Sequence, residues 1–203
     1  MPKSQALNII VVLNNIRSNE NVGSIFRTCD AVGVSKIILC GYTPTPTDRF
    51  GRENRGLTKA SLGAEKFVKW EKAESLKDAI VGLQNSFSVH VSECTDIFLL
   101  KNSDVAIQSG SQGIHKHAHS KNFVVIAVEQ NKKAVNYTKI RDRAKVYNMA
   151  LVFGNEVDGL SKEDLKLCDI VAEIPMYGKK ESLNVSVCAG VVLYSLIINS
   201  VHD

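Results

Sequence analysis

The sequence lacks several patterns, and each absence excludes a class of protein. No apolar run in the 203 residues approaches the length that spans a bilayer, so no membrane partner is expected. The apolar stretch near the start is too short for a signal peptide and fits a buried strand better. No Gly-x-Gly-x-x-Gly motif occurs, so the sequence gives little support for a nicotinamide-binding Rossmann domain.

Signatures of hydrolysis and of metal chemistry are also missing. The spacing of Gly154 and Gly159 resembles a phosphate-binding loop, but Leu160 stands where the phosphate-binding lysine belongs. The polar loops contain no Ser-His-Asp set, no paired carboxylates and no metal-ligand spacing. The histidine tract at 115–119 is only a compositional hint of metal binding, so no metal is predicted.

Cysteine usage and charge give weaker indications. Five cysteines form an odd set without close pairs, which predicts free thiols in a reducing cytoplasm. A net charge of +4 permits a nucleic-acid partner without requiring one. The composition is that of a globular protein, and the length fits a single domain over 1–203. A Ser-, Gly- and His-rich stretch at about 87–121 is predicted to be an insertion, with a hairpin and a loop.

Short apolar runs alternate with segments of helical periodicity. Buried strands are predicted at 7–13, 36–42, 124–128, 150–153 and 171–175. Helices are predicted at about 21–33, 57–67, 74–83, 161–169 and 181–201. This alternation predicts an α/β fold with a mostly parallel sheet and helices on both faces. Ligands of such sheets bind beyond the carboxyl ends of the strands, where polar loops are expected.

Two polar loops hold candidate functional residues. Asn21 lies at the predicted start of a helix and Arg27 nearly two turns inside it, an arrangement that suits phosphate. A helix cap with a surface arginine explains the same pair. After the fourth strand, Gly154 precedes Asn155 and Glu156, so a flat ligand could approach main-chain groups closely. A tight turn with an exposed glutamate explains this loop equally well.

A third polar loop precedes the C-terminal helix. Ser182, Asn184 and Ser186 are placed on its first turns, with Ser182 predicted as the N-cap. Asn184 inside an apolar helix is costly unless it is hydrogen-bonded, so a buried structural network is the alternative to a binding role. The three loops together fit an adenosine-like ligand, with apolar walls and backbone donors and acceptors.

Three segments resemble the successive motifs of a known enzyme family. They are NVGSIFRTCDAVGV (21–34), LVFGNEVDGLS (151–161) and IPMYGKKESLNVSVCAG (174–190). Their order and spacing are similar to those of the SpoU (TrmH-like) RNA 2′-O-ribose methyltransferases of the SPOUT superfamily. The resemblance covers most of the chain, excluding roughly 87–121.

The resemblance implies a reaction and an assembly. S-adenosyl-L-methionine is the implied cofactor and methyl donor, and the 2′-hydroxyl of a ribose in RNA, tRNA or rRNA, is the implied acceptor. Transfer RNA is weakly favoured. A C-terminal trefoil knot is implied, which is an exception to the rule that chains do not knot. Family members usually form homodimers with the active site near the subunit interface.

The family's functional positions carry over to this sequence. The implied catalytic residues are Asn21, Arg27, Glu156, Ser182 and Asn184. The implied cofactor contacts, mainly through backbone atoms, are Gly154, Ile174, Met176 and Leu183, with Glu129 as a further candidate. Proposals for the family make the arginine a general base. Because an arginine normally keeps its proton, electrostatic stabilisation by Arg27 is the preferred role.

Two basic segments are candidates for RNA contact. They contain Arg49, Arg52, Arg55, Lys59, Lys66 and Lys69, and Lys132, Lys133, Lys139, Arg141, Arg143 and Lys145. Such runs are usually solvated faces, so charge alone does not establish binding. Two alternatives stay open, a non-catalytic RNA-binding or assembly factor on the same scaffold and a small-molecule methyltransferase. Activity on nucleosides without a phosphate backbone would favour the latter.

Overall fold

The computed structural model describes residues 7–85, 123–144 and 148–201. The predicted insertion at about 87–121, with its hairpin and histidine tract, lies outside the described residues. Seven strands form one sheet in the order β3-β2-β1-β6-β4-β7-β5, and every pair of neighbours is parallel. They are β1 (Asn8–Asn14), β2 (Lys36–Cys40), β3 (Trp70–Ala73), β4 (Val124–Val128), β5 (Val135–Asn136), β6 (Asn148–Phe153) and β7 (Ile170–Glu173).

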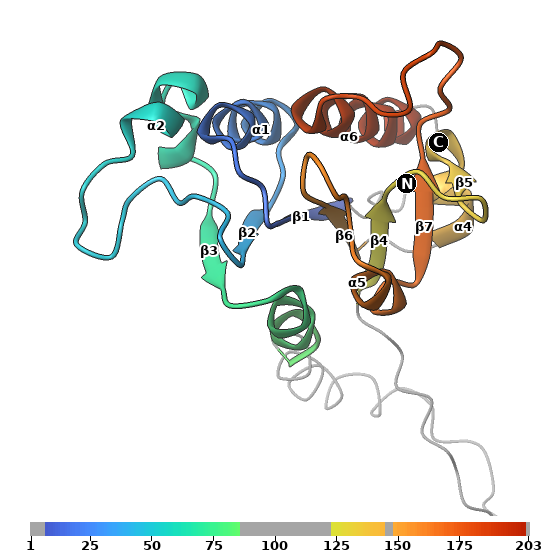
Figure 1. The fold of residues 1–203 in the computed structure, drawn as a ribbon, viewed down its shortest axis with the longest axis horizontal. Coiled ribbons are helices and arrows are strands. Elements are labelled where there is room, and N and C mark those ends of the chain that lie inside the picture. Colours follow the sequence, from blue (N-terminus) through green and yellow to red (C-terminus); the bar gives the residue numbers. More distant parts are fainter. Residues whose placement is uncertain (1–6, 86–122, 145–147, 202–203) are drawn as a thin grey trace, which may run out of the picture.

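Helices cover both faces of the sheet, as predicted (Figure 1). They are α1 (Asn19–Val32), α2 (Arg55–Ser61), the helix 76–85, α4 (Ile140–Ala144), α5 (Lys162–Lys166) and α6 (Val185–Val201). Two short 3₁₀ turns are η1 (Ala64–Lys66) and η2 (Tyr137–Lys139). Figure 1 shows α2, α1 and α6 in a row on one side of the sheet, with α5 and the helix 76–85 on the other.

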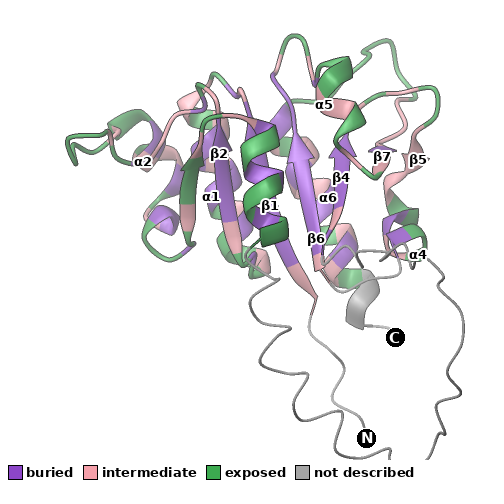
Figure 2. Ribbon diagram, turned by 90° about the horizontal axis from the view of Figure 1, so that it is seen from below, coloured by how far each residue is buried: buried purple, intermediate pink, exposed green. Residues whose placement is uncertain are grey.

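The alternation of side chains along β1 explains the two layers. Ile9, Val11 and Leu13 pack into a core with α1 and α6, while Ile10 and Val12 join a second core with the helix 76–85. Because each strand directs alternate side chains to two covered faces, its sequence is a continuous apolar run. Figure 2 shows the central strands buried along most of their length.

Two helix predictions were wrong at their boundaries. The helix predicted over 57–67 is broken, because Leu62 adopts a left-handed conformation with φ 52° and separates α2 from η1. The C-terminal helix begins at Val185, and Asn184 rather than Ser182 caps it. The Asn184 Oδ1 accepts a hydrogen bond of 2.9 Å from the Ser186 N–H. Asn184 is therefore an exposed cap residue and not a buried polar residue inside the helix.

Other boundaries agree more closely. Gly33 ends α1 in a left-handed conformation, and Ser161 caps α5 by accepting from the Asp164 N–H, close to the predicted helix bounds at 33 and 161. Asn21 is the third residue of α1, whose cap is Ser18. The sequence prediction missed β3, β5 and α4, which are short and lie at or near the edges of the sheet. In the part of the chain that is described, no helix is long and apolar enough to cross a membrane.

Candidate functional site

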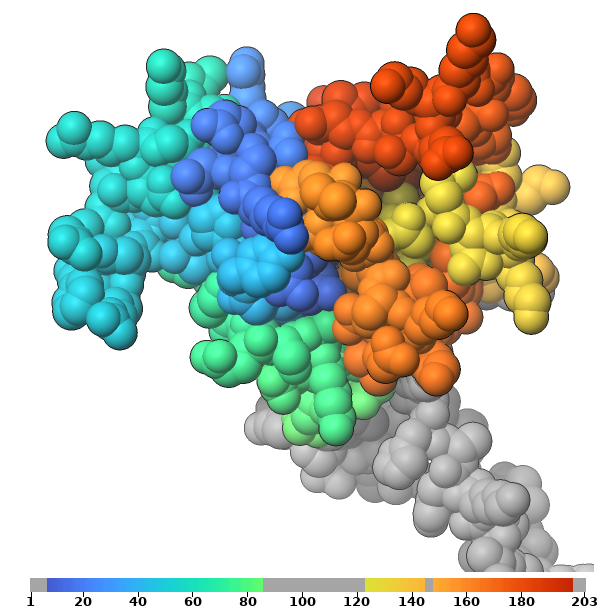
Figure 3. All heavy atoms as spheres, viewed as in Figure 1, coloured from blue at the N-terminus to red at the C-terminus, as the bar shows by residue number. Residues whose placement is uncertain are grey.

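The carboxyl ends of β1, β6, β4 and β7 deliver four loops to one edge of the sheet. A cavity of about 380 Å³ opens there between the loops and the start of α6. Figure 3 shows the loop after β6 and the C-terminal segment bordering the same hollow. The lining residues are Asn21, Val128, Glu129, Gln130, Phe153, Gly154, Asn155, Glu156, Val157, Gly159, Glu173, Ile174, Ser182, Leu183, Asn184, Val185 and Cys188.

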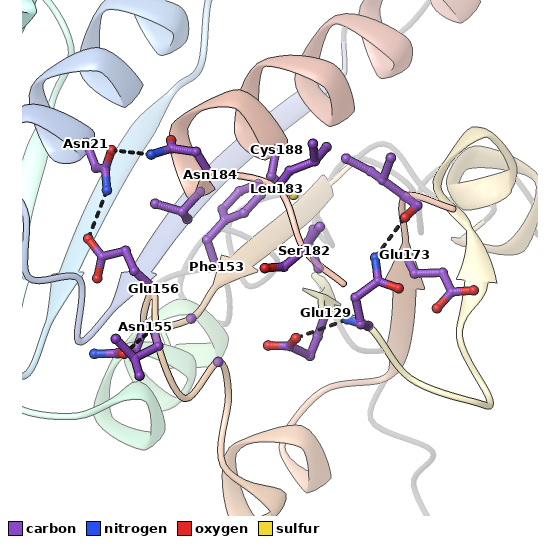
Figure 4. A pocket seen from close by; sticks show the side chains of 17 residues that line it. Asn21, Glu129, Phe153, Asn155, Glu156, Glu173, Ser182, Leu183, Asn184 and Cys188 are labelled. Carbon is purple, nitrogen blue, oxygen red and sulfur yellow. Dashed lines mark hydrogen bonds between the residues drawn. The ribbon is translucent and has the colours of Figure 1, made fainter. Parts of the chain in front are cut away.

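A chain of side-chain hydrogen bonds joins the three predicted loops (Figure 4). The Asn184 Nδ2 donates to the Asn21 Oδ1 at 3.0 Å. The Asn21 Nδ2 in turn donates to the Glu156 Oε1, also at 3.0 Å. Asn21 lies 135 positions before Glu156 and 163 positions before Asn184 in the sequence, so only the fold brings the three residues together.

Glu156 holds the loop after β1 against the loop after β6. Its carboxylate accepts from the Arg17 N–H at 2.9 Å and from the Ser18 N–H at 3.1 Å. Burial by itself would raise the pKa of Glu156. The hydrogen bonds from Arg17, Asn21 and Ser18 outweigh burial and lower the pKa of this carboxyl. Glu156 is thus an ionised positioning group whose oxygens are already engaged.

Asn155 is a structural anchor that the sequence analysis did not select. Its Nδ2 donates to the Asn15 carbonyl at 2.9 Å and to the Tyr42 hydroxyl at 2.6 Å, and the residue is only 7% exposed. Its Oδ1 accepts from the Val157 and Asp158 N–H groups, so it closes the turn from within. The signal in the sequence was an asparagine directly after a strand and a glycine, which is typical of such turns.

Gly154 is required by close backbone packing. A Cβ at this position would lie 2.6 Å from the Gly159 carbonyl carbon and 2.7 Å from the Leu160 nitrogen. Since both neighbours are backbone atoms, neither can move aside without opening the turn. The glycine therefore maintains the shape of the loop that borders the cavity.

Two carboxylates line the opposite side of the cavity. Glu129 accepts from the Leu160 N–H at 2.9 Å and from the Gln130 N–H at 3.0 Å. Glu173, which the sequence analysis did not predict, accepts from the Asn131 N–H at 3.3 Å. Figure 4 shows the Glu129 carboxylate and the Ser182 hydroxyl directed into the same space. Fixed carboxylates beside apolar walls favour a ligand that carries both a positive charge and a flat apolar part.

Apolar groups complete the walls. Phe153 is buried, whereas Leu183 and Val157 are 39% and 74% exposed and present surface that a ligand would cover. Cys188 also lines the cavity, and burial raises the pKa of its thiol to about 11. It is therefore a neutral thiol near pH 7 and contributes a wall rather than a nucleophile.

Two predicted site residues do not line the cavity. Arg27 lies on α1 with an exposed side chain, and Met176 is half-buried in the loop after β7. The other eight predicted residues, catalytic and cofactor-binding, all line it. Among the residues that the structure describes, no three His, Cys, Asp or Glu side chains are placed to hold a metal ion.

The comparisons with known proteins agree with this geometry. The model of the SpoU rRNA Methylase family matches residues 8–105 and 100–194. The chain belongs to this family. It is 29% identical over 186 residues to a tRNA (guanosine(18)-2′-O)-methyltransferase of Aquifex aeolicus, covering 92% of this chain and 67% of that one.

A second relative is the 23S rRNA (guanosine-2′-O-)-methyltransferase RlmB of Xylella fastidiosa. It is 30% identical over 190 residues, which cover 93% of this chain and 58% of the relative. The crystal structure of the SpoU methyltransferase AviRb from Streptomyces viridochromogenes with the cofactor AdoMet shares the fold, with a TM-score of 0.69 and 19% identity. The match covers 98% of this chain and 60% of AviRb. This chain therefore spans between 58% and 67% of the length of these three proteins.

Proposed function

We propose that this protein is an S-adenosyl-L-methionine-dependent methyltransferase acting on the ribose 2′-hydroxyl of an RNA, tRNA or rRNA. The observation that carries the proposal is the Asn184–Asn21–Glu156 hydrogen-bond chain beside a cavity with two fixed carboxylates. Two relatives named for 2′-O-methylation of tRNA and rRNA support the same reaction. The first of them is named for a transfer RNA substrate and the second for a ribosomal RNA substrate.

The residues of the cavity fit the proposed cofactor. Its volume of about 380 Å³ is within the range of small-molecule sites. Glu129 would face the positive charge, while Phe153 and Leu183 would cover the apolar part. The Ile174 carbonyl, which accepts from the Gln130 Nε2 at 2.7 Å, lies at the rim with the other backbone groups. When bound, the cofactor supplies a methyl group already activated on a sulfonium.

The chain's own groups then orient the acceptor. Asn21 and Asn184 form a fixed amide pair at one side of the cavity, and Ser182 presents its hydroxyl to the same space. Alignment of the 2′-hydroxyl with the methyl group supplies much of the rate. The hydroxyl proton would pass to solvent water as the oxygen attacks the methyl carbon. Negative charge develops on the ribose oxygen because proton loss runs ahead of bond formation.

Arg27 is proposed to stabilise that charge together with an RNA phosphate. It lies six residues after Asn21 on α1, about 9 Å along the helix axis. Its side chain is exposed, and the ion pairs of the described residues do not include it. A guanidinium in this state is available to grip a phosphate with two parallel hydrogen bonds.

The Arg27→Ala variant tests the reaction. We expect methyl transfer to unmodified RNA to be abolished while cofactor affinity, measured by calorimetry, stays within about twofold, because Arg27 does not line the cavity. The Arg27→Lys variant tests whether positive charge alone is sufficient, because lysine keeps the charge but lacks the planar guanidinium that binds phosphate through two hydrogen bonds. Asp30→Ala, at an exposed position of the same helix, is the matched control and should retain activity.

The outcomes separate the candidate functions. Retained turnover in Arg27→Ala would remove this residue from the mechanism. RNA binding by the wild type without any methyl transfer would favour the non-catalytic RNA-binding factor. Transfer to free nucleosides would favour the small-molecule methyltransferase. Tritiated methyl transfer followed by nucleoside analysis distinguishes all three.

Three further features belong to this proposal. We infer a single domain over 1–203 with an insertion at about 87–121, and a C-terminal trefoil knot as in the family. We also infer a homodimer formed through α6, where exposed apolar side chains follow one face of the helix. A cytoplasmic location fits the four described cysteines, which form no disulfide.

A further inference from the structure

The loop between β2 and α2 carries an aromatic ring between two arginines. Its sequence DRFGREN places Phe50 at the tip, where the side chain is 67% exposed and outside both core clusters. The Cζ of Arg49 and that of Arg52 lie 4.8 and 5.2 Å from the centre of the ring. A large apolar side chain held in this way contributes nothing to the core, so its exposure calls for another explanation.

Hydrogen bonds fix the shape of this loop. The Asp48 Oδ1 accepts from the Phe50 N–H at 2.8 Å and from the Arg52 N–H at 2.9 Å. The Asp48 Oδ2 accepts from the Arg52 Nε at 2.7 Å, and a bridge between Thr47 and Glu53 closes the base of the loop. A loop ordered before binding loses little conformational entropy when a partner docks.

The loop starts at the same edge of the sheet as the cavity. It follows the carboxyl end of β2, which neighbours β1, and Figure 1 shows it projecting beyond the end of that strand. Tyr42, at its first turn, accepts a hydrogen bond of 2.6 Å from Asn155 in the cavity wall. A molecule that contacts the loop could therefore reach the cavity without crossing the sheet.

We propose that this loop is an RNA-docking arm: Phe50 stacks on an unpaired base, and Arg49 binds a neighbouring phosphate. The inference rests on the proposed function and assigns part of its substrate recognition. Arg52 stays tied to Asp48 by an ion pair, whereas no ion pair among the described residues includes Arg49. Arg49 is thus free to move off the Phe50 ring, so that a base stacks on the ring while the guanidinium binds the phosphate.

Charge favours RNA over a second copy of this chain. Residues 48–59 hold four basic side chains and two acidic ones, an excess of two positive charges. Covering Arg49 with protein would cost desolvation unless the partner supplied a carboxylate. Nucleic acid offers both a ring face and a negative charge at the spacing of one nucleotide, which matches a ring beside a guanidinium.

The arm is tested by RNA binding without the methyl donor. The probes are a stem–loop RNA with 2-aminopurine in its unpaired loop and a blunt RNA duplex. We expect Phe50→Leu to raise the Kd for the stem–loop about tenfold and to abolish quenching of 2-aminopurine, with the duplex unaffected. Arg49→Ala should lower the slope of log Kd against log salt by about one.

Phe67→Leu is the matched control, because Phe67 is 78% exposed and, among the described residues, no arginine lies over its ring. It should bind both probes as the wild type does. Wild-type affinity and quenching in Phe50→Leu, or an equal loss on the duplex, would overturn the arm. Loss of self-association in Phe50→Leu with unchanged RNA binding would also overturn it and assign the loop to a protein contact.

The same variants separate this inference from the proposed function. If the wild type binds the stem–loop through Phe50 but transfers no methyl group, the reaction is wrong and the arm stands. If Phe50→Leu methylates RNA with an unchanged KM, the arm is wrong and the reaction stands.

Discussion

At the scale of single residues, Asn184 shows how one side chain can serve two elements. Its Oδ1 caps α6 through the Ser186 N–H, and its Nδ2 holds Asn21 on α1. Glu156 continues the same chain of hydrogen bonds into the loop after β6. Asn184 at the start of α6 is therefore both a helix cap and a part of the candidate site. Its substitution is expected to affect both the stability of the protein and methyl transfer.

Glu156→Gln tests the ionised end of this chain. We expect the free energy of unfolding to fall by about 1 kcal/mol and Tm by about 3 °C. The amide keeps one acceptor oxygen, but its NH2 group is a donor and cannot accept from the N–H groups that both carboxylate oxygens now serve. Methyl transfer should fall at least about tenfold, since Asn21 must compete with the Arg17 and Ser18 N–H groups for a single acceptor oxygen and is held less firmly. Asp158→Asn, at a 75% exposed side chain of the same loop, is the control and should change neither quantity.

The pH dependence of Glu156 has a defined sign. Its folded-state pKa lies below the ordinary 4.5, so its stabilisation is fully present above about pH 4.5. The stabilisation is lost as pH falls through the lower folded-state pKa. The difference in Tm between wild type and Glu156→Gln should therefore shrink below pH 4.5. A difference that stays constant down to pH 2 would contradict this assignment.

At the scale of elements, the contact between α1 and α2 depends on Gly23. A Cβ there would lie 2.7 Å from the Ala60 Cβ and would also meet the Leu57 carbonyl and the Ser61 nitrogen. Because α1 carries Asn21 and Arg27, the position of these residues depends on how closely the two helices approach. Packing between two helices outside the cavity thus sets the geometry at its rim.

Gly23→Ala should destabilise the protein by about 1–3 kcal/mol, since the backbones of two helices must separate. Gly82→Ala is the matched control in the helix 76–85, where a Cβ would meet nothing within 4 Å. The control should be neutral or slightly stabilising, as alanine is the better helix former. Chemical denaturation measures both, and equal stabilities for the two variants would refute the close-packing argument.

At the scale of the whole molecule, α6 presents a stripe that the described chain leaves open. Val187, Tyr194 and Ile198 share one face of the helix and are 52%, 47% and 55% exposed. The opposite face packs against α1 and the sheet through Ala189 and Leu193. A helix with apolar side chains on both faces fits an interface between two copies of the chain.

Tyr194→Glu should convert the proposed dimer into a monomer, because a charge in an apolar interface has no partner. Sedimentation velocity measures the change. Leu167→Glu, at a 36% exposed position near the end of α5, is the control and should remain dimeric. A monomeric wild type, or a dimer in both variants, would exclude α6 as the interface.

The sequence by itself determined the local elements and the identity of the loops. Continuous apolar runs marked β1, β2, β4 and β6, because strands covered on both faces admit few polar residues. The helix bounds predicted at 33 and 161 fall at Gly33 and Ser161, because left-handed and capping conformations favour these residue types. Short edge elements such as β5 were missed, since two residues carry no periodic signal.

Only the tertiary structure decided which of these loops meet. Pairing of β6 with both β1 and β4 brings Glu156 to Asn21 across 135 positions of the chain, and no local pattern encodes that order of strands. The same packing made Asn184 a cap, added Asn155 and Glu173 to the cavity and turned Arg27 towards solvent. Propensity acts over a few residues, whereas the cavity depends on long-range burial of both faces of one sheet.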